Sequence, residues 1–285
     1  MHDAPRPARP VRAAQTRTTP TPAGWIALAI FAGLAIVGFL GAVGVVSAFS
    51  RMTDGLPPVS ELDQITFSQQ SVVWDRTHKV ELARFGGEKR EVVPFEDIPP
   101  IVIDAQTAVE DKTFWDNAGF DPLAIISAGI DSVRGNSRGA STITHQLVRQ
   151  RLLDPALVQD PNRTFERKVK EIIQSVRLTE AYPGETGKQK IIAAYLNQNY
   201  YGNQAYGVKA AAKAYFGIDD LSKLTPAQAA ILAGLPKSPS NYDLVKNADV
   251  TCKVEPDPQT GDCPANQEQL EVNSDKPIVQ RRNAI

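Results

Sequence analysis

Two adjacent carboxylates stand at the end of an apolar stretch of the chain. Residues 101–115 carry apolar side chains at helical spacing, and Glu110 and Asp111 precede an Asn-Ala-Gly turn. A carboxylate that is partly removed from water at such a place can serve as a general base. A solvated pair of acids at a helix end would give the same pattern, so the spacing leaves both interpretations open.

A second charged set lies on one predicted helix, residues 163–182. Arg167 and Lys168 stand four and three residues before Glu171, so the glutamate neighbours both cations. Such a triplet can bind a phosphate through its cations while the carboxylate orients them or holds a metal ion. Ordinary salt bridges on a solvated helix face are the alternative.

The third candidate is a polar, glycine-bearing loop, residues 135–140, that includes Arg138 and leads into a helix ending near residue 153. Ser141 or Thr142 can cap this helix, and the free N–H groups of a first helical turn attract anions. His145, Gln146 and Arg149 follow within two turns. A helix cap without a ligand is the alternative.

An uncharged segment near the N-terminus predicts that the chain is anchored in a membrane. Residues 25–49 are 25 apolar or small residues without charge, long enough for a helix that crosses a bilayer. A buried core helix and a cleaved signal peptide are the alternatives. Residues 1–24 hold four arginines against one aspartate, so the positive-inside rule keeps them in the cytoplasm and exports the rest.

The exported part is predicted to be mainly helical. After a stalk, residues 71–95 read as a small β-ribbon, and helical patterns then cover residues 101–115, 122–134, 142–153, 163–182, 188–199, 206–216 and 226–235. We therefore expect a disordered tail over 1–24, a membrane anchor over 25–49, stalk and ribbon over 50–95, a helical domain over 96–245 and a loop-like tail over 246–285.

Composition excludes several classes of function. The chain has 285 residues, 42% of them hydrophobic and 22% charged, which is typical of a globular protein. A net charge of -1 gives no basic field for nucleic acid, and three His and two Cys exclude a Cys/His zinc cluster. Outside the cytoplasm a disulfide between Cys252 and Cys263 is expected, with two reduced cysteines as the alternative.

Five stretches between about residues 70 and 245 resemble, in order, the motifs of one family. They are Glu110-Asp111-Lys112-Thr113-Phe114 through Gly119, Gly139-Ala140-Ser141-Thr142-Ile143-Thr144-His145-Gln146, Arg167-Lys168-Val169-Lys170-Glu171, Tyr195-Leu196-Asn197-Gln198-Asn199-Tyr200-Tyr201-Gly202, and Leu232-Ala233-Gly234-Leu235-Pro236-Lys237-Ser238-Pro239-Ser240. The family is that of the peptidoglycan glycosyltransferases, found in class A penicillin-binding proteins and in monofunctional transglycosylases. Three residues depart from its pattern: Asn117 replaces a His, His145 replaces a Gln, and Arg149 stands where Lys is frequent.

The resemblance implies a mainly α, lysozyme-like fold with a membrane-hugging subdomain, and polymerisation of lipid II into β-1,4 glycan with inversion at the anomeric carbon. Glu110 would be the general base. Glu171 would hold the cations in place or hold a divalent metal, Mg or Mn, on the pyrophosphate; no cofactor is otherwise required. The other implied contacts with the substrate are Asp111, Phe114, Asn117, Ser141, Thr142, His145, Gln146, Arg149, Arg167 and Lys168.

The resemblance also implies partners: lipid II, the nascent glycan, the membrane, and other proteins of cell-wall synthesis and division, but not nucleic acid. The enzyme would be a single-pass protein of the plasma membrane with an extracytoplasmic catalytic domain. Arg281-Arg282-Asn283-Ala284-Ile285 resembles the stretch that leads towards a transpeptidase domain. A lytic hydrolase of the same glycan and an inactive membrane-anchored scaffold are the alternative functions.

Overall fold

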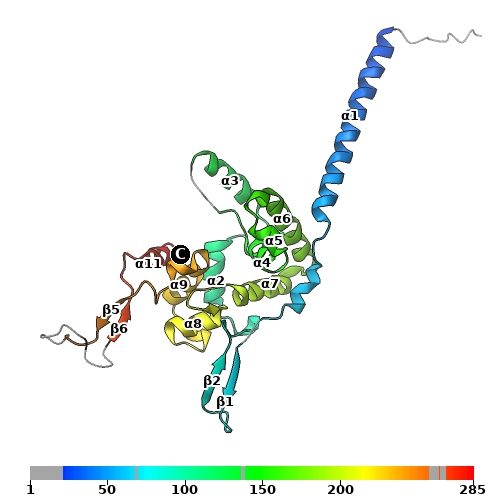
Figure 1. Cartoon of the computed structure of the whole chain (residues 1–285). Helices are drawn as coiled ribbons and strands as arrows, with labels where there is room; N and C mark the ends of the chain where they lie inside the picture. Colours follow the sequence, from blue (N-terminus) through cyan, green and yellow to red (C-terminus); the bar gives the residue numbers. More distant parts are fainter. Residues whose placement is uncertain (1–21, 68–69, 136–138, 257–262, 264–267) are drawn as a thin grey trace, which may run out of the picture. The chain divides into compact units, whose positions relative to one another are not determined.

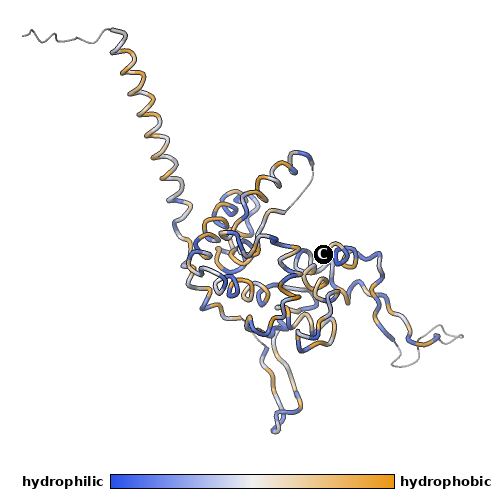
Figure 2. The backbone as a smooth tube through the Cα atoms, turned by 180° about the vertical axis from the view of Figure 1, so that it is seen from behind, coloured by the Kyte–Doolittle hydropathy of each residue, from blue (hydrophilic) through white to orange (hydrophobic). Residues whose placement is uncertain are grey.

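The computed structural model describes residues 22–285 except 68–69, 136–138, 257–262 and 264–267. The predicted disordered tail therefore lies almost entirely outside the described residues, as does Arg138. The chain divides into two compact units, residues 1–54 and 55–285. The unit formed by residues 1–54 holds helix α1 (Pro22–Thr53), in which Gly24–Gly44 is long and apolar enough to cross a membrane. Figure 2 shows its apolar character along nearly its whole length.

The second unit begins with the predicted β-ribbon. Strand β1 (Ser71–Trp74) pairs antiparallel with β2 (Glu81–Phe85), and Ser71 lies opposite Phe85. The turn between them is closed by Asp75, whose carboxylate accepts hydrogen bonds from the Thr77 hydroxyl and the Val80 amide. Hydrogen bonds from Thr77, Val80 and Lys79 lower the pKa of Asp75 to about 2. Strand β3 (Lys89–Arg90) instead pairs in parallel with β4 (Ala205–Tyr206).

The body of this unit is helical, as predicted (Figure 1). Its longer helices are α2 (Pro100–Glu110), α3 (Pro122–Val133), α4 (Ile143–Arg151), α6 (Thr164–Ala181), α7 (Gly184–Gln198), α8 (Val208–Phe216) and α9 (Pro226–Gly234). Two short helices, α5 (Pro155–Gln159) and α10 (Pro239–Tyr242), were not predicted. Helix α2 ends at residue 110 rather than 115 because Asp111 takes an extended φ of -159°.

Three helix pairs carry the core. Helix α2 packs against α9, and α4 packs against both α6 and α7. Leu147 of α4 and Ile191 and Leu196 of α7 are fully buried. Burying side chains of this size contributes about 1.5–3 kcal/mol each. The packing therefore fixes the end of α2 and the start of α4, which hold the first and third candidate sites.

Helix α3 is the exception, because its apolar side chains face outward. Leu123 is 74% exposed and Ile126 is 59% exposed, and Phe165 at the start of α6 is 74% exposed. Apolar colour dominates α3 in Figure 2. An apolar surface of this kind marks a site of contact with a membrane or a protein.

The C-terminal segment is folded, which corrects the prediction of a loop-like tail. Strands β5 (Asp249–Cys252) and β6 (Glu268–Glu271) form an antiparallel hairpin, and Cys252 and Cys263 are joined in a disulfide. Helix α11 (Pro277–Asn283) then packs beside α9 (Figure 1) with Ile278 and Val279 buried. The polar composition of this segment gave no sign of its fold, since only two residues of α11, Ile278 and Val279, are buried.

Candidate active site

A cavity of about 580 Å³ opens beside the C-terminal end of α2. It is lined by residues that are far apart in the sequence and belong to α2, α3, the loop before α4, α4, the turn after α9, and α11. They include Glu110, Asp111, Ser141, Thr142, Gln146, Lys237 and Arg281. The first and third sequence candidates thus share one cavity.

The carboxylate of Glu110 is held from two sides. Its Oε2 accepts a hydrogen bond from Gln146 Nε2 at 2.8 Å, and its Oε1 accepts one from Arg281 Nη2 at 3.0 Å. The side chain is 16% exposed. Because each carboxylate oxygen has two lone pairs, one on each oxygen is still free to accept a proton.

The amide of Gln146 is oriented in turn by Tyr195. The Tyr195 hydroxyl donates to Gln146 Oε1 at 3.2 Å, so the NH₂ end of the amide faces Glu110. Tyr195 is fully buried, and burial raises the pKa of its hydroxyl well above the usual value. The hydroxyl therefore keeps the proton that this contact needs.

Asp111 is a scaffold for α4 rather than a free acid. Its carboxylate accepts hydrogen bonds from the Ile143 amide at 3.1 Å and from Asn117 Nδ2 at 2.9 Å. The residue is 6% exposed, and burial raises the pKa of Asp111 above its usual value. Its contact with the first residue of α4 ties the two halves of the cavity together.

Thr142, one of the two capping residues that the sequence allowed, caps α4. Its hydroxyl accepts from the His145 amide at 3.1 Å and donates to the Gly119 carbonyl at 2.7 Å. The hydroxyl proton is therefore committed within the protein, and Thr142 lines the cavity without a donor to offer an anion. Its predicted contact with the substrate stays a prediction.

Glu171 lies beneath a group of cations. It is 1% exposed and accepts hydrogen bonds from Arg149 Nε at 2.6 Å and from Arg167 Nη1. Lys168 Nζ is 4.0 Å from its Oε2. Burial by itself would raise the pKa of Glu171, but the hydrogen bond from Arg149 and the three positive charges lower it below the usual value.

Ser141 connects this cation cluster (Arg149, Arg167 and Lys168) to the cavity. Its Oγ accepts from Arg149 Nη2 and from Lys168 Nζ, both at 3.3 Å, which leaves its hydroxyl proton free to donate. The side chain of Lys168 is 49% exposed and that of Arg149 is 29% exposed. Three cations over one carboxylate leave a net positive charge suited to an anionic ligand.

The surroundings of Glu171 favour the first of its two expected roles, holding the cations in place, over holding a divalent metal. Both of its oxygens already accept hydrogen bonds from Arg149, and a divalent cation there would be repelled by the cation cluster. No group of three or more His, Cys, Asp or Glu side chains suited to a metal occurs among the described residues.

Besides the cation cluster, three other predicted contacts lie outside the lining of the cavity. Phe114 is fully buried, with the Lys188 ammonium 4.8 Å from its ring centroid. Asn117 accepts a hydrogen bond from Lys188 Nζ and donates to Asp111. His145 is 4% exposed, and burial lowers its pKa to about 4, so it is neutral at pH 7.

The lining also holds residues that were not predicted, among them Lys237 and Arg281. Lys237 lies within the last quoted motif, so its charge was the available signal. Arg281 was noticed in the sequence only as a sign of a following domain. Its contact with Glu110 joins positions 171 residues apart, and no spacing rule reaches that far.

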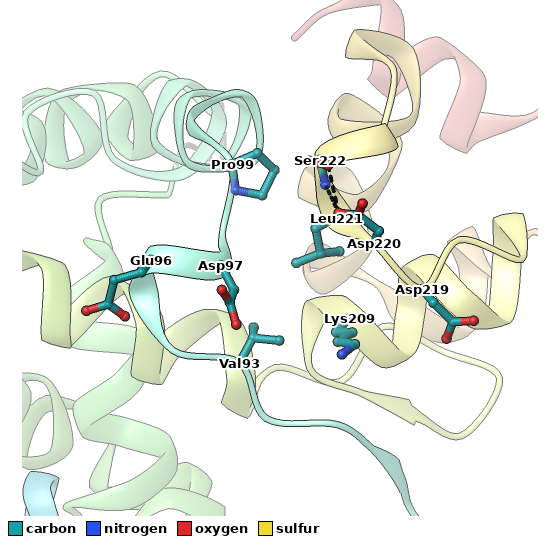
Figure 3. A pocket seen from close by; sticks show the side chains of 9 residues that line it. All are labelled: Val93, Glu96, Asp97, Pro99, Lys209, Asp219, Asp220, Leu221 and Ser222. Carbon is teal, nitrogen blue, oxygen red and sulfur yellow. Dashed lines mark hydrogen bonds between the residues drawn. The ribbon is translucent and has the colours of Figure 1, made fainter. Parts of the chain in front are cut away.

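A second cavity, of about 410 Å³, lies elsewhere in the same unit (Figure 3). Its acidic lining includes Asp219 and Asp220, but these carboxylates are satisfied by Lys213 at 2.7 Å and by the Ser222 hydroxyl at 2.7 Å. It contains none of the predicted site residues. The cavity at Glu110 is therefore the candidate active site.

Comparison with known proteins identifies a family for most of this chain. A family model described as a transglycosylase matches residues 78–255. Penicillin-binding protein 1A/1B of Bacillus subtilis (strain 168) is 38% identical over 218 residues, which cover 76% of this chain and 22% of that protein. Penicillin-binding protein 1A of Aquifex aeolicus (strain VF5) is 37% identical, covering 73% and 28%, and that of Escherichia coli (strain K12) is 34% identical, covering 74% and 24%. The chain thus spans about a quarter of the length of these relatives.

Proposed function

This chain belongs to the transglycosylase family, and we propose that it is a peptidoglycan glycosyltransferase that polymerises lipid II into β-1,4-linked glycan chains. The growing glycan on its polyprenyl pyrophosphate is the donor, and a fresh lipid II is the acceptor. The bond that breaks in the donor supplies the energy, which suits an enzyme that works without ATP outside the cytoplasm.

Glu110 is the general base of this reaction. It takes the proton of the acceptor's 4-hydroxyl as that oxygen attacks the anomeric carbon of the donor. The bond from that carbon to the pyrophosphate breaks on the opposite face, so the α-linkage becomes β, as in the single displacement of inverting glycosidases. The two contacts to Gln146 and Arg281 support this role, because they fix the carboxylate and leave a lone pair free.

The cation cluster stabilises the departing pyrophosphate. A dianionic pyrophosphate is already a good leaving group, so it needs neutralisation of charge more than it needs a proton. The partly exposed Lys168 and Arg149, with the free proton of Ser141, are placed to donate to it. Glu171 keeps the cations in register, and a divalent metal, where one is used, would be bound by the pyrophosphate itself.

The observation that carries the proposal is Ser141, which lines the cavity of Glu110 and also contacts two members of the cation cluster. A base in this cavity and an anion site joined to it through Ser141 suit a displacement that expels pyrophosphate. A lytic hydrolase would expel a sugar hydroxyl and would have no use for the cluster. An inactive scaffold would have no use for the supported carboxylate.

We place the enzyme at the plasma membrane with its N-terminus in the cytoplasm. Helix α1 serves as the single anchor, and the exposed apolar side chains of α3 serve as a second contact with the bilayer. Both would keep the active site near a substrate that is confined to the membrane. Other proteins of cell-wall synthesis and division are the expected protein partners.

The test supplies the detergent-solubilised chain with labelled lipid II in one reaction and with finished, lipid-free glycan in another. We expect high-mass glycan from lipid II that lysozyme digests, and no change in the finished glycan. Release of short muropeptides from the finished glycan would establish the hydrolase instead. Binding of lipid II without turnover would establish the scaffold.

A further inference from the structure

Arg281, near the end of helix α11, forms an ion pair with the proposed general base. Its guanidinium contacts Glu110 through Nη2, at 3.0 Å from Oε1, and both side chains are only 16% exposed. An ion pair of this kind is removed from most of the solvent that weakens surface pairs. Arg281 also lies outside residues 78–255, which match the family model.

The guanidinium is fixed from its other end as well. Arg281 Nε donates to the backbone carbonyl of Gly234 at 3.1 Å. A Cβ placed on Gly234 would lie 3.4 Å from Cγ and Cδ of Arg281, so the aliphatic stem packs directly on α9. Ile278 and Val279 are buried one turn earlier and hold α11 in place. The contact to Glu110 is therefore made by a group with little freedom of its own.

The two partners of Glu110 approach different oxygens. Gln146, itself oriented by Tyr195, holds Oε2, while Arg281 holds Oε1. A carboxylate held by only one of them could still rotate about its terminal bond, since that torsion is broad. With both in place its plane is fixed, and the remaining lone pairs point in a defined direction.

We propose that Arg281 is a positioning residue for glycosyl transfer, which acts by holding the carboxylate of Glu110 in the orientation that accepts the proton of the acceptor hydroxyl. The proposal rests on the proposed function of Glu110. It makes α11 a working part of the active site. The competing explanation is that the ion pair only attaches α11 to the body of the domain.

The experiment compares Arg281→Lys, Arg281→Met and Arg281→Ala in the full chain. The matched control is Arg282→Ala, since Arg282 is the next residue of α11 and its guanidinium donates to the side-chain oxygen of Asn283. Misplacement of a catalytic group by about 1 Å can cost on the order of 100-fold in rate. We expect kcat to fall about 10- to 100-fold in Arg281→Met and Arg281→Ala with KM for lipid II changed less than about 3-fold, and Arg282→Ala to match the wild type.

Two further readouts separate positioning from attachment. Added guanidinium ion should restore part of the kcat of Arg281→Ala, where it can occupy the vacated site, but should not restore Glu110→Gln. Arg281→Lys should be intermediate, since one ammonium cannot reproduce two directed contacts. Wild-type kcat in folded Arg281→Met, or a loss that merely follows the folded fraction and is not rescued, would overturn the proposal.

Failure of the proposed function can be told apart from failure of the proposed role of Arg281. If the wild type makes no polymer, the general function fails, and a thermal double-mutant cycle of Glu110→Gln and Arg281→Met then decides the pairing. Loss of the Arg281 guanidinium should lower the unfolding temperature less in the Glu110→Gln background than in the wild type. Strictly additive shifts would show that Arg281 does not hold Glu110.

Discussion

Lys188 donates to the side-chain oxygen of Asn117 at 3.1 Å and thereby fixes which end of that amide faces Asp111. The NH₂ end is left to donate to the Asp111 carboxylate, which in turn holds the first amide of α4. Asn117 stands where the family pattern has a histidine. In this chain an amide, which does not titrate, takes that place and is held by a buried lysine.

The first prediction concerns this connection. Asn117→Ala should destabilise the fold by about 1–3 kcal/mol, because it strips one donor from buried Asp111 and one acceptor from buried Lys188. Chemical denaturation of the full chain in detergent measures the change. Asn162→Ala, at an exposed position, is the control and should leave stability within about 0.5 kcal/mol. Equal stability of the two variants would show that the connection contributes nothing to the free energy of unfolding.

The second prediction concerns Glu171 and pH. Its pKa is lower in the folded chain than the ordinary value of 4.5, so its ionisation stabilises the fold above that pH and the stabilisation is lost as pH falls through the lower, folded value. Glu171→Gln should therefore cost at least about 2 kcal/mol at pH 7, since it leaves the cations without their buried partner, and the difference from wild type should shrink below about pH 4.5.

Denaturation midpoints at pH 7 and at decreasing pH provide the measurement. Glu166→Gln is the matched control on the same helix, because Glu166 pairs with Arg163 at 2.7 Å while remaining 31% exposed. A surface pair of that kind is worth about 0–1 kcal/mol. A Glu171→Gln cost that does not vary with pH would contradict the account.

Contacts between residues that are close in the sequence could be predicted. The i,i+4 spacing of Arg167 and Glu171 predicted their contact, and the two hydroxyl residues before α4 predicted its cap, which is Thr142. The burial of single side chains and the contacts between distant segments could not be predicted, because they depend on how the helices pack. Phe114 and His145 share motifs with exposed residues yet point inward, and the pair formed by Arg281 and Glu110 exists only because α11 packs on α9.

The third prediction concerns the leaving group. Lys168→Ala should weaken binding of the pyrophosphate-bearing donor by about 1.5–3 kcal/mol, the usual worth of a hydrogen bond to a charged group. Ser141→Ala should weaken it less, since a neutral donor is lost. Lys170→Ala is the control, because Lys170 pairs with Glu166 rather than Glu171. Binding is measured with a non-reacting donor analogue. Unchanged affinity in Lys168→Ala would show that Lys168 forms only an ordinary surface salt bridge and does not bind the donor.

The fourth prediction concerns the disulfide. Closing a loop of 11 residues between Cys252 and Cys263 contributes about 2–3 kcal/mol by chain entropy. Because Ile278 and Val279 anchor α11 independently, reduction should loosen β5 and β6 and leave α11 in place. Hydrogen exchange with and without reductant tests this, with Cys252→Ser as the matched variant. Loss of protection in α11 on reduction would show that the disulfide holds the helix as well.

The central claim is that Glu110 is the general base of lipid II polymerisation, and Glu110→Gln tests it most directly. The substitution keeps the size of the side chain and removes its basicity, and Asp104→Asn on the exposed face of α2 is the matched control. With labelled lipid II, the wild type and Asp104→Asn should give high-mass glycan that lysozyme digests, while folded Glu110→Gln should give none. Polymer from Glu110→Gln at a rate near that of the wild type would contradict the claim.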